Sequence, residues 1–130
     1  MNNIAKMKRI RVLVVDDHPV LRRIIGNVLK KYPDLNLVGE ADNGREALRK
    51  ALELQPDVVL MDVNMPVMNG IEATQLIKKA APRIHIIGLS MHEDDDTAAT
   101  MKFVGASEYL IKTSPAEQVI AVILNLCSQW

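Results

Sequence analysis

Short apolar runs alternate with stretches of helical periodicity along the whole chain, and this alternation restricts the fold more than any other feature. Runs that suit strands are found at Ile10–Val15, Leu35–Glu40, Asp57–Asp62, Ile84–Leu89 and Ser107–Ile111. A strand that is followed each time by a helix implies a parallel sheet, because crossover connections are right-handed and place the helices over both faces. The sequence therefore predicts an α/β fold made of strand–helix repeats.

Helix start signals stand between these runs. Pro19 is expected at a first helical position, where its missing N–H does no harm. Asn43–Glu46 and Asn69–Glu72 have the spacing of a capping box, so a helix is expected to begin at each. A weaker helix is expected at Glu93–Val104, with acidic residues in its first turn. Ser114–Glu117 repeats the capping-box spacing and predicts the start of the last helix.

Among doubly wound parallel sheets we choose the flavodoxin-like (βα)5 arrangement, with the strand order 2-1-3-4-5. The first strand then lies beside the third, and a cleft opens between their carboxyl ends where the strand order reverses. Leu35–Glu40 is more polar than the other runs, so it is expected at an edge of the sheet. Ligands are therefore expected at the carboxyl edge, next to the first and third strands.

Polar residues stand at the ends of the central strands. Asp16 and Asp17 follow the first strand, and Asp62 closes the third. Ser90 and Lys112 follow the fourth and the fifth. Since the carboxyl ends of parallel strands share one edge of the sheet, we expect these five side chains to converge.

This set of residue types predicts metal-dependent phosphoryl chemistry. Carboxylates that lie close together repel one another, and a cation must neutralise them if they are to stay ionised. Oxygen ligands without a cysteine or histidine cluster favour Mg²⁺. A carboxylate can attack a phosphoryl group to form an aspartyl phosphate, while an ammonium and a hydroxyl stabilise the phosphoryl oxygens.

Four segments together resemble the receiver domain of response regulators, of the NarL/FixJ type. They are Asp16–Pro19, Asp62–Gly70 with its Met-Pro and Asn-Gly pairs, Ser90, and Tyr109–Lys112. The resemblance covers the chain from about residue 9 to residue 126. We accordingly expect residues 1–8 to be a flexible leader and residues 9–130 to be the receiver domain.

The resemblance implies a role for each acidic residue. Asp62 would accept a phosphoryl group from a histidine kinase, a phosphotransfer protein or a small phosphodonor. Asp17 and Asp62 would bind Mg²⁺ directly, together with the backbone carbonyl of Asn64. Asp16 would act on the ion through a water molecule.

The resemblance also implies how the phosphoryl group is sensed. Lys112 and Ser90 would hold it, and Ser90 with Tyr109 would form a switch pair that remodels the surface of the fourth helix, fifth strand and fifth helix. That surface would control an output domain or partner, in transcription regulation. The domain would accept the phosphoryl group and could remove it by autodephosphorylation, without being a turnover enzyme.

The composition of the chain limits the kinds of binding partner and the cellular compartment that we expect. The chain has 16 basic and 16 acidic residues, which argues against direct binding to nucleic acid. NarL/FixJ relatives usually carry a DNA-binding effector domain, so we expect contact with DNA only through such a domain, whether this chain is an excised or a stand-alone receiver. They also make a homodimer plausible. The single cysteine, Cys127, suits a reducing compartment, here the cytoplasm. No apolar run has membrane-spanning length.

Three other readings stay open from the sequence. A magnesium-dependent phosphatase with an aspartyl nucleophile would use the same carboxylates, although such enzymes usually show Asp-x-Asp at the first strand. A flavin-binding module would need a phosphate-binding loop where the acidic pair Asp16–Asp17 stands. A degenerate receiver that acts only as a scaffold would not need the complete acidic set.

Overall fold

The computed structural model describes residues 9–128, so the expected leader at residues 1–8 lies outside the described residues. The strands are β1 (Ile10–Val15), β2 (Leu35–Ala41), β3 (Val58–Asp62), β4 (His85–Ser90) and β5 (Glu108–Ile111). The helices are α2 (Pro19–Lys30), α3 (Gly44–Leu54), α4 (Gly70–Ala80), α5 (Asp95–Phe103) and α6 (Ala116–Leu126). The predicted alternation of strand and helix is confirmed.

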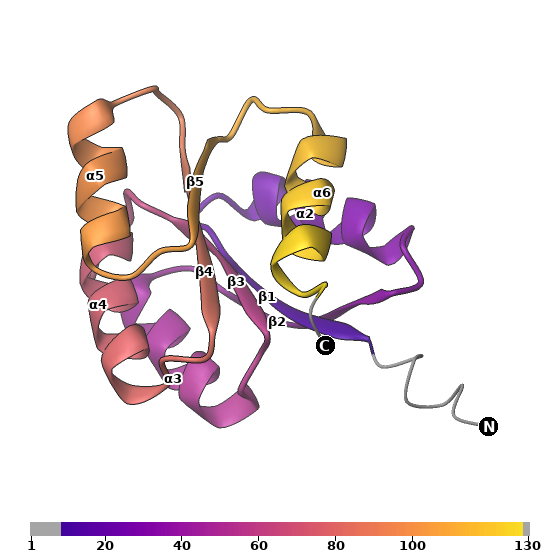
Figure 1. Ribbon diagram of the computed structural model, residues 1–130, viewed down its shortest axis with the longest axis horizontal. Helices are drawn as coiled ribbons and strands as arrows, with labels where there is room; N and C mark the ends of the chain where they lie inside the picture. The colour runs from indigo at the N-terminus through magenta and orange to yellow at the C-terminus, as the bar shows by residue number, and fades with distance from the viewer. Residues whose placement is uncertain (1–8, 129–130) are drawn as a thin grey trace.

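The strands form one parallel sheet in the order β2-β1-β3-β4-β5, as predicted. Helices α2 and α6 cover one face of the sheet, and α3, α4 and α5 cover the other (Figure 1). The polar strand β2 lies at an edge of the sheet, where its half-exposed polar side chains remain in contact with water. None of the helices in residues 9–128 is long and apolar enough to cross a bilayer.

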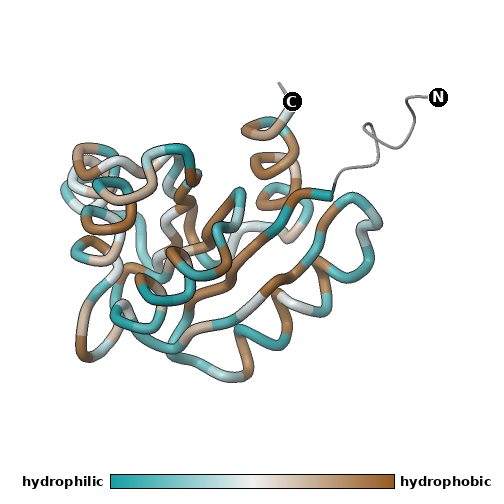
Figure 2. The backbone as a smooth tube through the Cα atoms, turned by 90° about the horizontal axis from the view of Figure 1, so that it is seen from below, coloured by the Kyte–Doolittle hydropathy of each residue, from teal (hydrophilic) through white to brown (hydrophobic). Residues whose placement is uncertain are grey.

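Strand β3 is buried over its whole length and divides the core in two. Val59 and Met61 pack under α3, α4 and α5, together with Met101. Leu60 packs on the opposite face under α2 and α6, together with Ile123. The strands are largely brown in the hydropathy colouring of Figure 2, as a sheet covered on both faces requires. Asp62 therefore ends a rigid, fully enclosed strand.

The predicted helix starts hold at three of the five places. Pro19 is the first residue of α2. Asn69 and Glu72 form a complete capping box at α4. At α3 the Asn43 side chain accepts the N–H of Glu46 at 2.9 Å, whereas the Glu46 carboxylate pairs with Arg49 instead of returning the bond.

The remaining two starts differ from the prediction. Asp94 was expected inside the first turn of a helix, but it precedes α5 and its side chain accepts the N–H groups of Asp96 and Thr97. The capping box at Ser114–Glu117 is absent, because α6 begins at Ala116 and no side chain caps it. The Ser114 N–H instead donates to the Ile111 carbonyl at 2.9 Å, which closes a turn directly after β5.

The loop between β3 and α4 is tied down by backbone contacts. The Gly70 N–H donates to the Val63 carbonyl at 2.9 Å, and a Cβ at position 70 would lie 2.2 Å from the carbonyl oxygen of Asp62. Val67 has a φ of 68°, a left-handed conformation that is rare for a β-branched residue. The loop therefore turns sharply and holds Asp62 at the rim of the sheet.

Candidate functional site

The predicted acidic residues meet at the carboxyl edge of the sheet. Strands β1 and β3 are neighbours, with Val15 beside Met61, so the residues that follow lie side by side. Asp16 and Asp62 are only 1% and 2% exposed, whereas the Asp17 side chain is 30% exposed. Two of the three carboxylates are thus enclosed by protein, and the third faces the opening.

Lys112 reaches this acidic cluster from the end of β5. Its Nζ lies 2.9 Å from Asp16 Oδ2 and 3.1 Å from Asp62 Oδ2. The lysine side chain is only 6% exposed, so it is a buried cation and not a surface lysine. Its backbone N–H donates to the Ser90 carbonyl at 2.7 Å, which joins the ends of β5 and β4.

Three further predicted site residues lie on or next to the central strands: Ser90 ends β4, Asn64 follows β3 and Tyr109 belongs to β5. Ser90 is the buried last residue of β4, and its Oγ accepts the His92 N–H at 3.4 Å. The Asn64 N–H donates to Asp62 Oδ1 at 3.1 Å. The Tyr109 ring packs against the core cluster beneath α5, and its buried hydroxyl finds no hydrogen-bond partner among the described residues.

Burial and charge set the protonation of the cluster. Burial, together with the charge of Asp16, raises the pKa of Asp62 to about 6 despite the opposing hydrogen bond from Lys112. Burial also disfavours the Asp16 anion, but hydrogen bonds from Lys112 and His18 outweigh it, so the pKa of Asp16 is lowered. The pKa of Lys112 is raised because its two carboxylate partners outweigh its burial. One ammonium therefore does not fully compensate the paired carboxylates.

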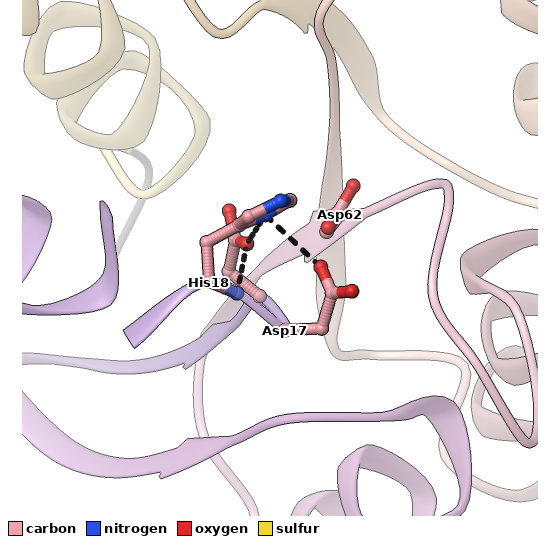
Figure 3. A group of neighbouring side chains, drawn as sticks. Asp17, His18 and Asp62 are labelled. Atoms are coloured by element: carbon pink, nitrogen blue, oxygen red, sulfur yellow. Dashed lines mark hydrogen bonds and ion pairs between the residues drawn. The ribbon is translucent and has the colours of Figure 1, made fainter. Parts of the chain in front are cut away.

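His18 is a member of the cluster that the sequence analysis did not single out. Its Nδ1 lies 2.9 Å from Asp16 Oδ1 and 3.0 Å from Asp17 Oδ1. A dashed line in Figure 3 marks the contact between His18 and Asp17. Its backbone N–H also donates to Asp16 Oδ1 at 2.9 Å. The only signal in the sequence was its position directly after the acidic pair.

Arg22 is a second contact that the sequence analysis missed. Its Nη1 donates to the backbone carbonyl of Asp16 at 2.6 Å, and its Nε pairs with Glu40 at 3.2 Å. Arg22 lies on the first turns of α2, so it fixes the end of β1 against that helix. No residue pattern marked it apart from other helical arginines.

The cluster fits a divalent cation. Ligand atoms from Asp16, Asp17, His18 and Asp62 all lie within 4.8 Å of one another. Within residues 9–128, only Lys112 and His18 place a side-chain nitrogen within ion-pair distance of these carboxylates. An ion there would offset the burial of the Asp62 charge and its repulsion from Asp16, which together raise the pKa of Asp62.

Comparison with known proteins agrees with this geometry. The family model of the response regulator receiver domain matches residues 12–124. The chain is 43% identical over 121 residues to the response regulator GacA of Pseudomonas viridiflava, covering 92% of this chain and 56% of GacA. It is 43% identical over 114 residues to the transcriptional regulatory protein LiaR of Bacillus subtilis, and this match covers 88% of this chain and 54% of LiaR. The chain thus spans about half the length of both relatives.

A solved structure supports the same assignment. The signal receiver domain of a response regulator named NarL, from Mycobacterium tuberculosis, matches with a TM-score of 0.88 and 30% identity. The match covers 94% of this chain and 98% of that domain. The resemblance drawn from Asp16–Pro19 and Asp62–Gly70 is confirmed. The chain therefore belongs to the family of response regulator receiver domains, the signalling modules of two-component systems.

Proposed function

We propose that this domain is a phosphorylation-controlled switch in which Asp62 accepts a phosphoryl group from a histidine kinase or phosphotransfer protein. A carboxylate oxygen of Asp62 attacks phosphorus, the bond between phosphorus and the donor nitrogen breaks, and the donor histidine takes back a proton. The observation that carries the proposal is the meeting of buried Asp62 and buried Lys112, with Asp16 alongside. Asp62 acts as an acceptor and not as the nucleophile of a turnover enzyme.

We assign Mg²⁺ to the acidic cluster. Asp17, Asp62 and the backbone carbonyl of Asn64 are the proposed direct ligands, and Asp16 is proposed to act through a water molecule. Bound there, the ion would neutralise charge on the phosphoryl oxygens and on the carboxylates. Asp17 is the most exposed of the three acids, which gives an ion access from solvent.

Lys112 and Ser90 are the proposed partners of the transferred group. In the unphosphorylated domain Lys112 divides its ammonium between Asp16 and Asp62. Once Asp62 is phosphorylated to an acyl phosphate, its carboxyl loses the charge and the phosphoryl oxygens become the stronger acceptors, so the ammonium turns to them. The Ser90 hydroxyl, at the end of the neighbouring strand, donates a further hydrogen bond.

The proposed signal passes through Ser90 and Tyr109 to the surface formed by α5, β5 and α6. Gly88 of β4 leaves room for the Tyr109 ring: a Cβ there would lie 3.2 Å from it and 2.9 Å from Met101. A shift of Ser90 toward the phosphoryl group would change this packing and bias the surface between two states. We propose that the surface controls an effector domain or a homodimer, in transcription regulation in the cytoplasm.

Intact-mass measurement after incubation with acetyl phosphate and Mg²⁺ tests the acceptor role. We expect one phosphoryl adduct, which is lost without the metal and lost in Asp62→Asn. Asp95→Asn is the matched control, because Asp95 is an exposed acid near the same edge and should keep the adduct. An adduct that persists in Asp62→Asn would contradict the proposal. So would a domain that binds Mg²⁺ yet takes no phosphoryl group from acetyl phosphate or from a histidine kinase.

Sedimentation with and without a phosphoryl mimic tests the output role. The homodimer proposal predicts a larger species only when the mimic and Mg²⁺ are present. Identical profiles would remove the dimer and leave contact with an effector as the output.

A further inference from the structure

His18 places a nitrogen atom inside a group of carboxylate oxygens. Its Nδ1 is 2.9 Å from Asp16 Oδ1 and 3.0 Å from Asp17 Oδ1. In Figure 3 a dashed line joins the imidazole ring of His18 to Asp17, and the Asp62 carboxylate lies nearby. The His18 side chain is 58% exposed, so solvent and ions reach it.

Without an ion, these separations are those of a hydrogen bond and an ion pair, and they also equal the spacing of adjacent ligand atoms around a metal ion. In an octahedral site with bonds of about 2.1 Å, two adjacent ligand atoms lie about 3.0 Å apart. Nδ1 stands at this distance from two different carboxylate oxygens at once. The ring nitrogen and Asp17 Oδ1 can therefore become neighbouring ligands of one ion without a rearrangement of the backbone.

We propose that the imidazole of His18 is a nitrogen ligand, which widens the magnesium site to borderline divalent ions such as Mn²⁺ and Ni²⁺. Coordination uses the lone pair of Nδ1, so the ring carries its proton on Nε2 and the ion replaces the hydrogen bond between Nδ1 and Asp16 Oδ1. Mg²⁺ prefers oxygen ligands and gains little from the imidazole, whereas first-row transition ions bind imidazole well. This inference rests on the metal site assigned above.

The position of His18 suits a substitution test. It precedes α2 and its side chain makes no capping bond, so His18→Ala leaves the start of the helix unchanged. His92 provides a matched control, because it also lies in a loop at the carboxyl edge, while within residues 9–128 no hydrogen bond or ion pair joins its side chain to the acidic cluster. His92→Ala removes one histidine from the same edge of the sheet.

Electron spin-echo spectroscopy of the Mn²⁺-loaded domain detects a nitrogen atom that is bound to the ion. We expect the modulation of a coordinated imidazole nitrogen in the unaltered domain and in His92→Ala, and its loss in His18→Ala. In equilibrium titrations, His18→Ala should bind Ni²⁺ about tenfold more weakly, while its affinity for Mg²⁺ changes by less than about threefold.

Two results would overturn the inference. One is bound Mn²⁺ without nitrogen modulation in the unaltered domain, a result that stands even if His18→Ala does not fold. The other is an unchanged ratio of Ni²⁺ to Mg²⁺ affinity in His18→Ala. If either result is obtained while the unaltered domain still forms a phosphoryl adduct with Mg²⁺, only the proposed role of His18 is wrong. If it binds no divalent ion and forms no adduct, the proposed function fails as well.

Discussion

Asp62 combines a negative charge with almost complete burial, at 2% exposure. Burial raises its pKa from an ordinary value of 3.8 to about 6, and the neighbouring Asp16 contributes in the same direction. The folded domain therefore binds a proton at this residue over a pH range in which the unfolded chain has already released it. Ionised Asp62 is a source of instability that a cation at the site would relieve.

Because the pKa of Asp62 is higher in the folded state, the contribution of this residue to stability falls as pH rises from about 4 to about 6. Above about pH 6, Asp62 is ionised in the folded domain, and the whole free-energy cost of burying its charge lowers the stability. Asp62→Asn removes the charge, so in metal-free buffer near neutral pH it should raise the free energy of unfolding by ~1–3 kcal/mol.

Urea unfolding of both proteins with a chelator, measured across this pH range, checks the prediction. The difference between the two proteins isolates Asp62 from the other acids, several of which have lowered pKa values and the opposite slope. If the free energies of unfolding of the two proteins changed in parallel between about pH 4 and about pH 6, Asp62 would not change its proton binding on folding.

Gly70 is held against the backbone of the residue that it helps to position. A Cβ at position 70 would lie 2.2 Å from the Asp62 carbonyl oxygen and 2.9 Å from Val63 Cα. Since backbone atoms cannot give way locally, Gly70→Ala should lower the free energy of unfolding by about 3 kcal/mol.

Gly26→Ala in α2 is the matched control, measured by the same denaturant unfolding. Its Cβ would meet only the movable end of the Leu37 side chain, at 3.2 Å, and alanine favours a helix interior. This variant should stay within about 1 kcal/mol of the unaltered domain. Equal losses at the two positions would contradict the close approach at Gly70.

At the scale of elements, similar local patterns led to different outcomes. Asn69–Glu72 and Ser114–Glu117 have the same capping spacing in the sequence. The first forms a complete capping box, while the second forms none because a turn after β5 engages the Ser114 backbone. The pattern predicted where each helix begins to within about two residues. It did not predict which side chain makes the cap, since that depends on the preceding turn.

The two positions give a direct comparison of a real cap with an apparent one. Asn69→Ala should lower the free energy of unfolding by about 1 kcal/mol, because the N–H of Glu72 loses its acceptor. Ser114→Ala should change it by less than about 0.5 kcal/mol. Chemical denaturation of both variants measures the difference, and a larger loss at Ser114 than at Asn69 would contradict the assignment of caps.

At the scale of the whole molecule, the topology followed from the alternation of strand and helix, because few arrangements of parallel strands satisfy the crossover rule. The convergence of Asp16, Asp62 and Lys112 followed in turn from their places at strand ends. Three features were beyond sequence reasoning: the ring of His18 between two carboxylates, the close approach of Gly70, and the left-handed Val67. Each depends on distances between elements or on local backbone strain.

Metal binding should appear as a property of the whole fold. The acidic cluster assembles from β1 and β3 only in the folded state, so an ion that binds it stabilises the domain. At ten times its dissociation constant, Mg²⁺ should add about 1.4 kcal/mol to the free energy of unfolding.

Thermal melts with Mg²⁺ and with a chelator measure this effect. Asp17→Asn should abolish the shift, whereas Glu53→Gln, on the exposed surface of α3, should keep it. A shift of equal size in Asp17→Asn would contradict the assigned site.

We propose that Asp62, and not another acid of the cluster, carries the phosphoryl group. Borohydride reduction of the phosphorylated domain followed by peptide mapping tests this most directly, because it marks the acyl phosphate at its residue. We predict that the mark lies at Asp62 alone. A mark at Asp16 or Asp17, or one outside the acidic cluster, would contradict the account.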